Sequence, residues 1–175
     1  MSTAPTDPAT ATAAPAAAAL TDAVRASRLA AELSPAQASV LAGLLRLAWF
    51  APKQVIAPEG AADNHLYEVV AGTLGVVAHW GTPDETLIAT LHPGDFAHEL
   101  GFLDGAQRHA TLVATSPAQV LVLAREQLET LIDTDARILY GVMRAIVKTV
   151  HRVQTRLAMQ SVELTNYIVK QHGRY

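Results

Sequence analysis

Apolar residues follow a helical period in the first part of the chain. Over 21–33 they recur at steps of three and four, which predicts a short amphipathic helix. A second helix is predicted to start at Ser34, because Ser34 can cap it, Pro35 suits the first turn and Gln37 can return a hydrogen bond. Its apolar face contains Val40, Leu41, Leu44, Leu45 and Ala48, and residues 49–52 end it.

After residue 52 the period becomes that of β-strands. Short apolar runs cover residues 54–56, 66–70, 73–78, 86–91, 110–114 and 118–123. Turn signals rich in Gly, Pro and Asp separate these runs. Many short strands at close, regular spacing predict a mainly β fold, an antiparallel barrel or roll with flanking helices.

The helical period returns at Arg125. A short helix is predicted there, and Asp133, Thr134 and Asp135 then open a long one, because acidic residues favour the positive end of a helix. Apolar residues in the long helix alternate at steps of four and three, which is a heptad seam. The seam residues are Leu139, Met143, Ile146, Val150, Val153, Leu157, Gln160, Leu164 and Tyr167. We expect a homodimer joined along this seam; the alternative is that the seam packs on the barrel of the same chain.

Composition and charge narrow the class of protein. The chain has 175 residues, half of them hydrophobic, with a net charge of −3 at pH 7, so one domain with a core is expected and the overall charge does not indicate nucleic acid. There is no cysteine, which excludes disulfides, Cys-based zinc sites and thiol catalysis and fits a cytoplasmic protein. No apolar run approaches the length of a membrane span.

Four parts are expected along the chain. Residues 1–20 are rich in Ala, Thr and Pro and lack a basic start, which predicts a disordered lead and not a secretion signal. Residues 21–133 hold the first helices and the β-roll, 134–171 the long helix, and 172–175 a tail.

The strongest chemical signal lies in residues 93–111, with the sequence PGDFAHELGFLDGAQRHAT. Glu99 and Arg108 stand in it on either side of a short apolar helix candidate and an Asp-Gly turn. A guanidinium fork suits a phosphate, and a fixed carboxylate suits a pair of sugar hydroxyls. A pocket that uses both is predicted to hold a nucleotide.

This stretch resembles the phosphate-binding cassette of the cyclic-nucleotide-binding family, which includes catabolite-activator-like regulators and kinase regulatory subunits. The matching positions are Phe96, Glu99, Leu100, Gly101, Phe102, Arg108, Ala110 and Thr111, and Gly60, Gly72 and Gly94 fall at the spacing of the family's turns. The resemblance implies a jelly-roll-like β-roll. It also implies that Arg108 and backbone N–H groups of the short helix hold the cyclic phosphate, while Glu99 accepts from the ribose hydroxyl.

Several positions depart from the family pattern. His98 stands where the family has Gly, and His109 stands where a small or hydroxyl residue is usual. By a gapless register, Val153 and Gln154 replace the hydroxyl pair that cAMP-responsive activators offer to adenine. The implied ligand-binding residues are Glu99, Leu100, Arg108, His109, Ala110, His98 and Gln154. The ligand stays open among cAMP, cGMP, cyclic di-GMP and none.

The function that the resemblance implies is a non-enzymatic sensor that binds a cyclic nucleotide and signals through a dimer helix to an unidentified protein. No covalent cofactor and no membrane association are expected. The family's transcription factors continue into a helix-turn-helix module, for which the sequence leaves no room, so no DNA-binding domain is expected. The alternative is a degenerate domain that acts as a ligand-free dimerisation or protein-interaction module.

Two other signals carry less weight. His92, His98, Glu99 and His109 suggest a cupin-like metal site, but neighbours on a strand point to opposite faces, so His98 and Glu99 would not share a metal. A basic stripe at steps of four in the long helix is interpreted as a solvated flank rather than a nucleic-acid surface. We find no motif of a known catalytic class.

Overall fold

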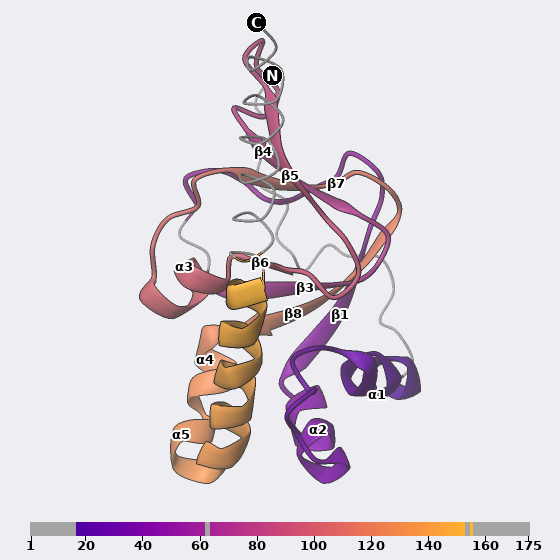
Figure 1. The fold of residues 1–175 in the computed structure, drawn as a ribbon. Helices are drawn as coiled ribbons and strands as arrows, with labels where there is room; N and C mark the ends of the chain where they lie inside the picture. Colours follow the sequence, from indigo (N-terminus) through magenta and orange to yellow (C-terminus); the bar gives the residue numbers. More distant parts are fainter. Residues whose placement is uncertain (1–16, 62–63, 153–154, 156–175) are drawn as a thin grey trace, which may run out of the picture.

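The computed structural model describes residues 17–61, 64–152 and 155, which form a β-roll with helices along one side (Figure 1). Two antiparallel four-stranded sheets make the roll, with the strand orders β1-β8-β3-β6 and β2-β7-β4-β5. In the first sheet the strands are β1 (Leu45–Phe50), β8 (Ala118–Ala124), β3 (His65–Ala71) and β6 (Phe96–Ala97). In the second they are β2 (Val55–Ala57), β7 (Thr111–Ala114), β4 (Leu74–Ala78) and β5 (Thr86–Leu91). The predicted fold class is confirmed.

The first helix is shifted from its predicted position. α1 (Ala17–Ala26) begins inside the segment expected to be a disordered lead, because Ala is the best helix former, and it ends earlier than expected. It ends where Glu68 accepts the N–H groups of Arg28 at 2.6 Å and Leu29 at 3.3 Å, which takes both donors out of the helical pattern. Residues 1–16, the rest of the expected lead, lie outside the described part of the chain.

The second helix starts as predicted. α2 (Pro35–Ala42) is capped by Ser34, whose Oγ accepts the Gln37 N–H at 3.3 Å. The Gln37 side chain accepts the Ser34 N–H at 3.0 Å in return, so the predicted capping box is confirmed. This local exchange of hydrogen bonds fixes the start of α2.

The predicted continuation of that helix through Ala48 is wrong. The chain turns at Gly43 and enters β1, which pairs with β8 along its whole length, from Leu45 opposite Leu123 to Phe50 opposite Ala118. Leu45 and Ala48, which suggested a continued helix face, are buried on the strand instead. Pairing with a distant strand therefore overrides the local helical period.

One glycine fixes the connection between β3 and β4. Gly72 has a φ of +78°, and a Cβ added there would lie 2.1 Å from the carbonyl oxygen of Pro117. A side chain would meet both backbone strain and a clash, so only glycine allows the two segments to approach this closely. This contact packs the turn between β3 and β4 against the residues that lead into β8.

Helices also follow the roll. α4 (Arg125–Glu129) and α5 (Leu131–Thr134) come after β8, and a long helix covers 136–152. Of the three residues predicted to open the long helix, Asp133 and Thr134 belong to α5. Asp135 opens the long helix, because its Oδ1 accepts the N–H groups of Arg137 at 3.2 Å and Ile138 at 3.4 Å. Within the described ranges, no helix has the length and apolar character needed to cross a membrane.

Two apolar cores stabilise the fold. One fills the roll, and the other lies between the first sheet and the helices (Figure 1). The pleat of β3 divides its side chains between them: Leu66 belongs to the core on the helix side, and Tyr67 and Val69 to the core of the roll. Glu68 follows Leu66 by two residues and therefore faces the helices.

The long helix contributes to the core on the helix side, which corrects the expected dimer seam. Ile146 is 0% exposed and packs there with Ile138 and Val142, so it has no surface for a partner chain. Leu139, Met143 and Val150 are partly buried against the same core. The other expected seam residues, Val153, Leu157, Gln160, Leu164 and Tyr167, lie outside the described residues.

Candidate functional site

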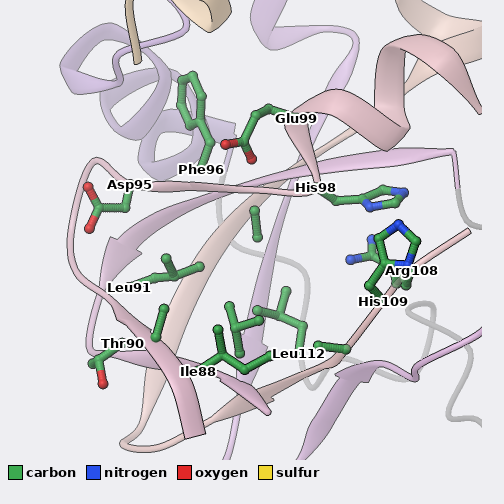
Figure 2. Close-up of a pocket in the computed structure, with 14 residues that line it drawn as sticks. Ile88, Thr90, Leu91, Asp95, Phe96, His98, Glu99, Arg108, His109 and Leu112 are labelled. Atoms are coloured by element: carbon green, nitrogen blue, oxygen red, sulfur yellow. The ribbon is translucent and has the colours of Figure 1, made fainter. Parts of the chain in front are cut away.

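A cavity of about 590 Å³ lies between the second sheet and the segment that leads into α3 (Glu99–Asp104) (Figure 2). Its walls come from β4, β5, β7 and residues 95–99. Apolar side chains form most of the wall, and the polar ones are Thr90, Asp95, His98, Glu99, Arg108 and His109. A cavity of this size suits a small organic ligand.

A tight turn brings Asp95 to the edge of the cavity. The Gly94 N–H donates to the Val69 carbonyl at 2.8 Å, and the Val69 N–H donates to the Asp95 carbonyl at 3.0 Å, so the turn is fastened to β3. The Asp95 carboxylate accepts the His92 N–H at 3.0 Å and lies 3.9 Å from Nη1 of Arg28. The sequence prediction did not include Asp95 among the site residues, although it lies in the same stretch.

His98 holds a backbone conformation that L-residues rarely adopt. Its φ of 69° and ψ of 27° are left-handed, which costs about 1 kcal/mol for a residue with a side chain. This matches the Gly expected at this position from the resemblance. The imidazole lies against Gly101, and Figure 2 shows it turned toward the end of the cavity that holds Arg108 and His109.

Glu99 is the first residue of α3 and lines another part of the cavity. Figure 2 shows its carboxylate directed toward Phe96, away from Arg108. Burial raises the pKa of Glu99, and the negative charge of Asp95 adds to this increase, while the Glu99 backbone N–H opposes it. The carboxyl group therefore takes up a proton more readily than an exposed glutamate.

Arg108 is held inside the wall of the cavity and is 6% exposed. Its guanidinium lies over the ring of Tyr67, with Cζ 5.1 Å from the ring centroid, and Nη2 donates to the His65 carbonyl at 3.5 Å. The main chain of Arg108 is fixed as well. The Gly60 N–H donates to the Arg108 carbonyl at 2.9 Å, and the Arg108 N–H donates to the Ala61 carbonyl at 3.3 Å. These contacts give the guanidinium a defined position.

Most of the predicted ligand-binding residues meet at this cavity. Its lining includes His98, Glu99, Arg108, His109 and Ala110. Leu100 does not line it: the side chain is 59% exposed on the outer side of α3, because a helix turns successive residues to different sides. The part predicted for Leu100 therefore stays a prediction for its backbone N–H alone, and Gln154 lies outside the described residues.

Sequence reasoning missed the apolar wall. It is formed by Val76, Ile88, Ala89, Leu91, Phe96, Ala97 and Leu112. The strands were predicted, but not which of their faces would line a cavity. β4 and β7 are apolar along nearly their whole length, so their sequences gave no signal for which side chains face the cavity.

The arrangement combines a cationic end, a carboxyl end and an apolar wall. An anionic group suits Arg108, and a ring system suits the apolar wall. Among the residues that the structure describes, no three His, Cys, Asp or Glu side chains gather closely enough to hold a metal ion. The cupin-like alternative therefore has no geometric support.

The fold of this chain is similar to that of several solved structures. A cyclic nucleotide-binding domain from Methylobacillus flagellatus superposes with a TM-score of 0.69 at 18% identity, covering 85% of this chain and 83% of that one. The Thermus thermophilus catabolite activator protein gives 0.62 at 26% identity, covering 81% and 64%. The regulatory domain of Toxoplasma gondii PKA, solved with cAMP, gives 0.59 at 16% identity, covering 75% and 50%.

The family comparison rests on the sequence. Among curated proteins no match is found. The family model described as "Cyclic nucleotide-binding domain" matches residues 47–135, just over half of the chain, from β1 through the cassette to α5. The chain therefore belongs to the cyclic nucleotide-binding domain family.

Proposed function

We propose that the chain is a non-enzymatic regulatory module that binds a cyclic nucleotide in the cavity at Arg108. One observation carries this proposal: a buried guanidinium and a partly buried carboxyl, from Arg108 and Glu99, line different parts of one cavity with an apolar wall between them. A cyclic nucleotide has the matching parts, namely a phosphate, ribose hydroxyls and an apolar base face.

Each side chain has a role in this proposal. Arg108 donates two N–H groups to the exocyclic phosphate oxygens, a geometry that its planar fork favours. Glu99 turns toward the ligand and accepts from a ribose hydroxyl, and the base lies along Ile88 and Leu91 of β5. His98 and His109 lie next to Arg108 and add hydrogen-bonding groups around the phosphate. The base is left to experiment, with cAMP, cGMP and cyclic di-GMP as candidates.

Calorimetric titration tests the proposal. The full chain is titrated with each of the three nucleotides, as wild type and as Arg108→Ala. We expect at least one nucleotide to bind, and the substitution to weaken that binding by about 100-fold, since charge-assisted hydrogen bonds to one phosphate contribute about 3 kcal/mol. Arg137→Ala is the matched control, because Arg137 is exposed on the long helix and does not line the cavity. Equal affinity in wild type and Arg108→Ala would contradict the assigned site.

The second candidate is a ligand-free protein-interaction module. The position of His98 favours it, because a bulky imidazole lines the cavity at a place where the family resemblance implies glycine. If the chain is such a module, calorimetric titration of the wild type with each of the three nucleotides gives no heat of binding, while the chain still self-associates.

We also propose that the chain forms a homodimer through the long helix, with a seam rotated from the expected one. Tyr140 and Val147 are 65% and 60% exposed, and Met143 and Val150 are partly buried beside them. These four residues alternate at steps of three and four, so they form a heptad stripe that runs between the exposed side of the helix, at Tyr140 and Val147, and the border of its core-facing side, at Met143 and Val150. A second copy would cover this stripe.

A further inference from the structure

The turn between α1 and α2 contacts the edge of the cavity at one end and the long helix at the other. We name residues 28–33 the linking turn. It belongs neither to the cassette nor to the long helix, yet it touches both.

At the cavity, Arg28 lies over the turn that carries Asp95. A Cβ added to Gly94 would come within 2.7 Å of Arg28 Nε, so the guanidinium rests directly on this glycine. Arg28 Nη1 is buried and makes no hydrogen bond with any residue that the structure describes, and it lies 3.9 Å from Asp95 Oδ1. A charge-assisted hydrogen bond is about 2.8 Å long. A movement of about 1 Å would therefore turn this loose ion pair into a hydrogen bond.

In the middle, Glu68 anchors the linking turn to the roll. Its carboxylate is 2% exposed and accepts the Arg28 and Leu29 N–H groups. Glu68 pairs with Phe96 across the β3–β6 ladder, and Phe96 lines the cavity. The strand pair that forms part of the cavity wall thus also holds the linking turn.

At the far end, two residues of the linking turn, Glu32 and Leu33, contact the long helix. Glu32 pairs with Arg144 at 3.2 Å and also with Lys148. Leu33 packs on Gly141, where an added Cβ would lie only 2.4 Å from Leu33 Cδ2. Such close packing means that a displacement of the turn is transmitted to the helix.

We propose that the linking turn couples occupancy of the cavity to the position of the long helix, and that the Arg28–Asp95 contact closes when a ligand draws the 95–99 segment inward. This inference rests on the proposed function, because it needs a ligand in the cavity. The coupling has a physical source: the Arg28–Asp95 hydrogen bond forms in the occupied state and is absent from the open one, so the two states differ in free energy at the turn.

Amide hydrogen exchange on the full chain tests this coupling. Wild type, Arg28→Gln, Glu32→Gln and Arg25→Gln are measured without nucleotide and with cAMP, cGMP or cyclic di-GMP at saturation. Arg25 is the matched control, since it is exposed near the end of α1. In wild type we expect a bound nucleotide to change exchange over 136–148 by at least about threefold. Arg28→Gln and Glu32→Gln abolish most of that change, and Arg25→Gln preserves it.

A wild-type-like response of the long helix in Arg28→Gln, with nucleotide bound, would overturn the coupling while leaving the proposed function intact. If no nucleotide binds the wild type, the proposed function fails. The exchange rates of the ligand-free samples then test the coupling. We then expect Arg28→Gln to speed exchange over 141–148 by at least about threefold relative to Arg25→Gln, and equal rates would overturn the coupling. Glu32→Gln supplies the same readout from the far end of the turn if Arg28→Gln does not fold.

Discussion

The imidazole of His98 lies directly on the Cα of Gly101: a Cβ added to Gly101 would come within 2.1 Å of His98 Cε1. His98 also has a φ of 69°. The first turn of α3 therefore accommodates a histidine where the family resemblance implies glycine, because the residue three positions later has no side chain. The two positions act as a pair.

This pairing predicts non-additive effects on stability. Gly101→Ala should cost about 1–2 kcal/mol, because the new methyl group displaces the His98 ring. His98→Gly should not destabilise the fold. It should raise the free energy of unfolding by up to about 1 kcal/mol, since glycine adopts the left-handed conformation without strain. In the double variant the cost of Gly101→Ala should largely disappear. Urea denaturation of the four proteins measures the coupling, and simple additivity would contradict the contact.

The burial of Glu68 predicts that stability falls as pH rises. Desolvation raises its pKa to about 7 from the ordinary 4.5, against the hydrogen bonds from Arg28 and Leu29. Since the folded pKa is the higher one, this contribution is fully present below about pH 4.5 and is lost as pH rises through about 7. Between pH 5 and 8 the free energy of unfolding of the wild type should fall by about 2–3 kcal/mol because of this group.

Denaturation midpoints over pH 5–8 test this prediction with Glu68→Gln, which should show a much flatter profile than wild type. Glu126→Gln is the control, because Glu126 is exposed and its pKa is lowered, mainly by a hydrogen bond from its own backbone N–H, so it does not titrate in this range. The assignment of a raised pKa to Glu68 is wrong if Glu68→Gln keeps the wild-type slope.

Two glycines with the same backbone conformation should respond differently to alanine. Gly72 and Gly81 have φ values of +78° and +76°, but only at Gly72 does an added Cβ meet backbone, the Pro117 carbonyl at 2.1 Å. We expect Gly81→Ala to cost about 1 kcal/mol from strain alone, and Gly72→Ala at least about 3 kcal/mol or loss of folding. Similar costs for the two would show that the close approach at Gly72 is not structural.

Substitutions at neighbouring positions of the long helix separate the core from the proposed dimer face. Ile146→Ala should cost about 2–4 kcal/mol, because Ile146 is fully buried in the core of its own chain. Val147→Glu should convert the dimer to a monomer without unfolding, because Val147 is 60% exposed on the proposed stripe. Arg137→Glu, on an exposed flank of the same helix, should remain dimeric. Sedimentation velocity combined with thermal denaturation gives both readouts; a dimer that survives Val147→Glu would exclude this seam.

The features that were predicted correctly from the sequence depend on contacts between residues that are close together in the chain. The Ser34–Gln37 capping box, the opening of the long helix at Asp135 and the placement of His98, Glu99 and Arg108 at one cavity all follow from residues within about twenty positions of one another. Turn residues likewise marked the ends of most strands, so six of the eight strands in the described part of the chain were found from the sequence.

Distant contacts decided the features that the sequence did not predict. Leu45 fits a helix face and a strand equally well, and its pairing with Leu123 of β8 selects the strand. Glu68 stood in a predicted strand, but its burial depends on the turn after α1, which offers two N–H groups. The dimer seam was placed by its heptad spacing, and Ile146 satisfies that spacing while packing into its own chain.

The most direct test of the central proposal is a titration of the ¹⁵N-labelled chain with cAMP, cGMP and cyclic di-GMP, followed through the backbone amide signals. We expect at least one nucleotide to shift the signals of residues 95–112 and of β5 most strongly, Arg108→Ala to remove these shifts and Arg137→Ala to retain them. Unchanged spectra with all three nucleotides, or shifts confined to residues away from the cavity, would contradict it.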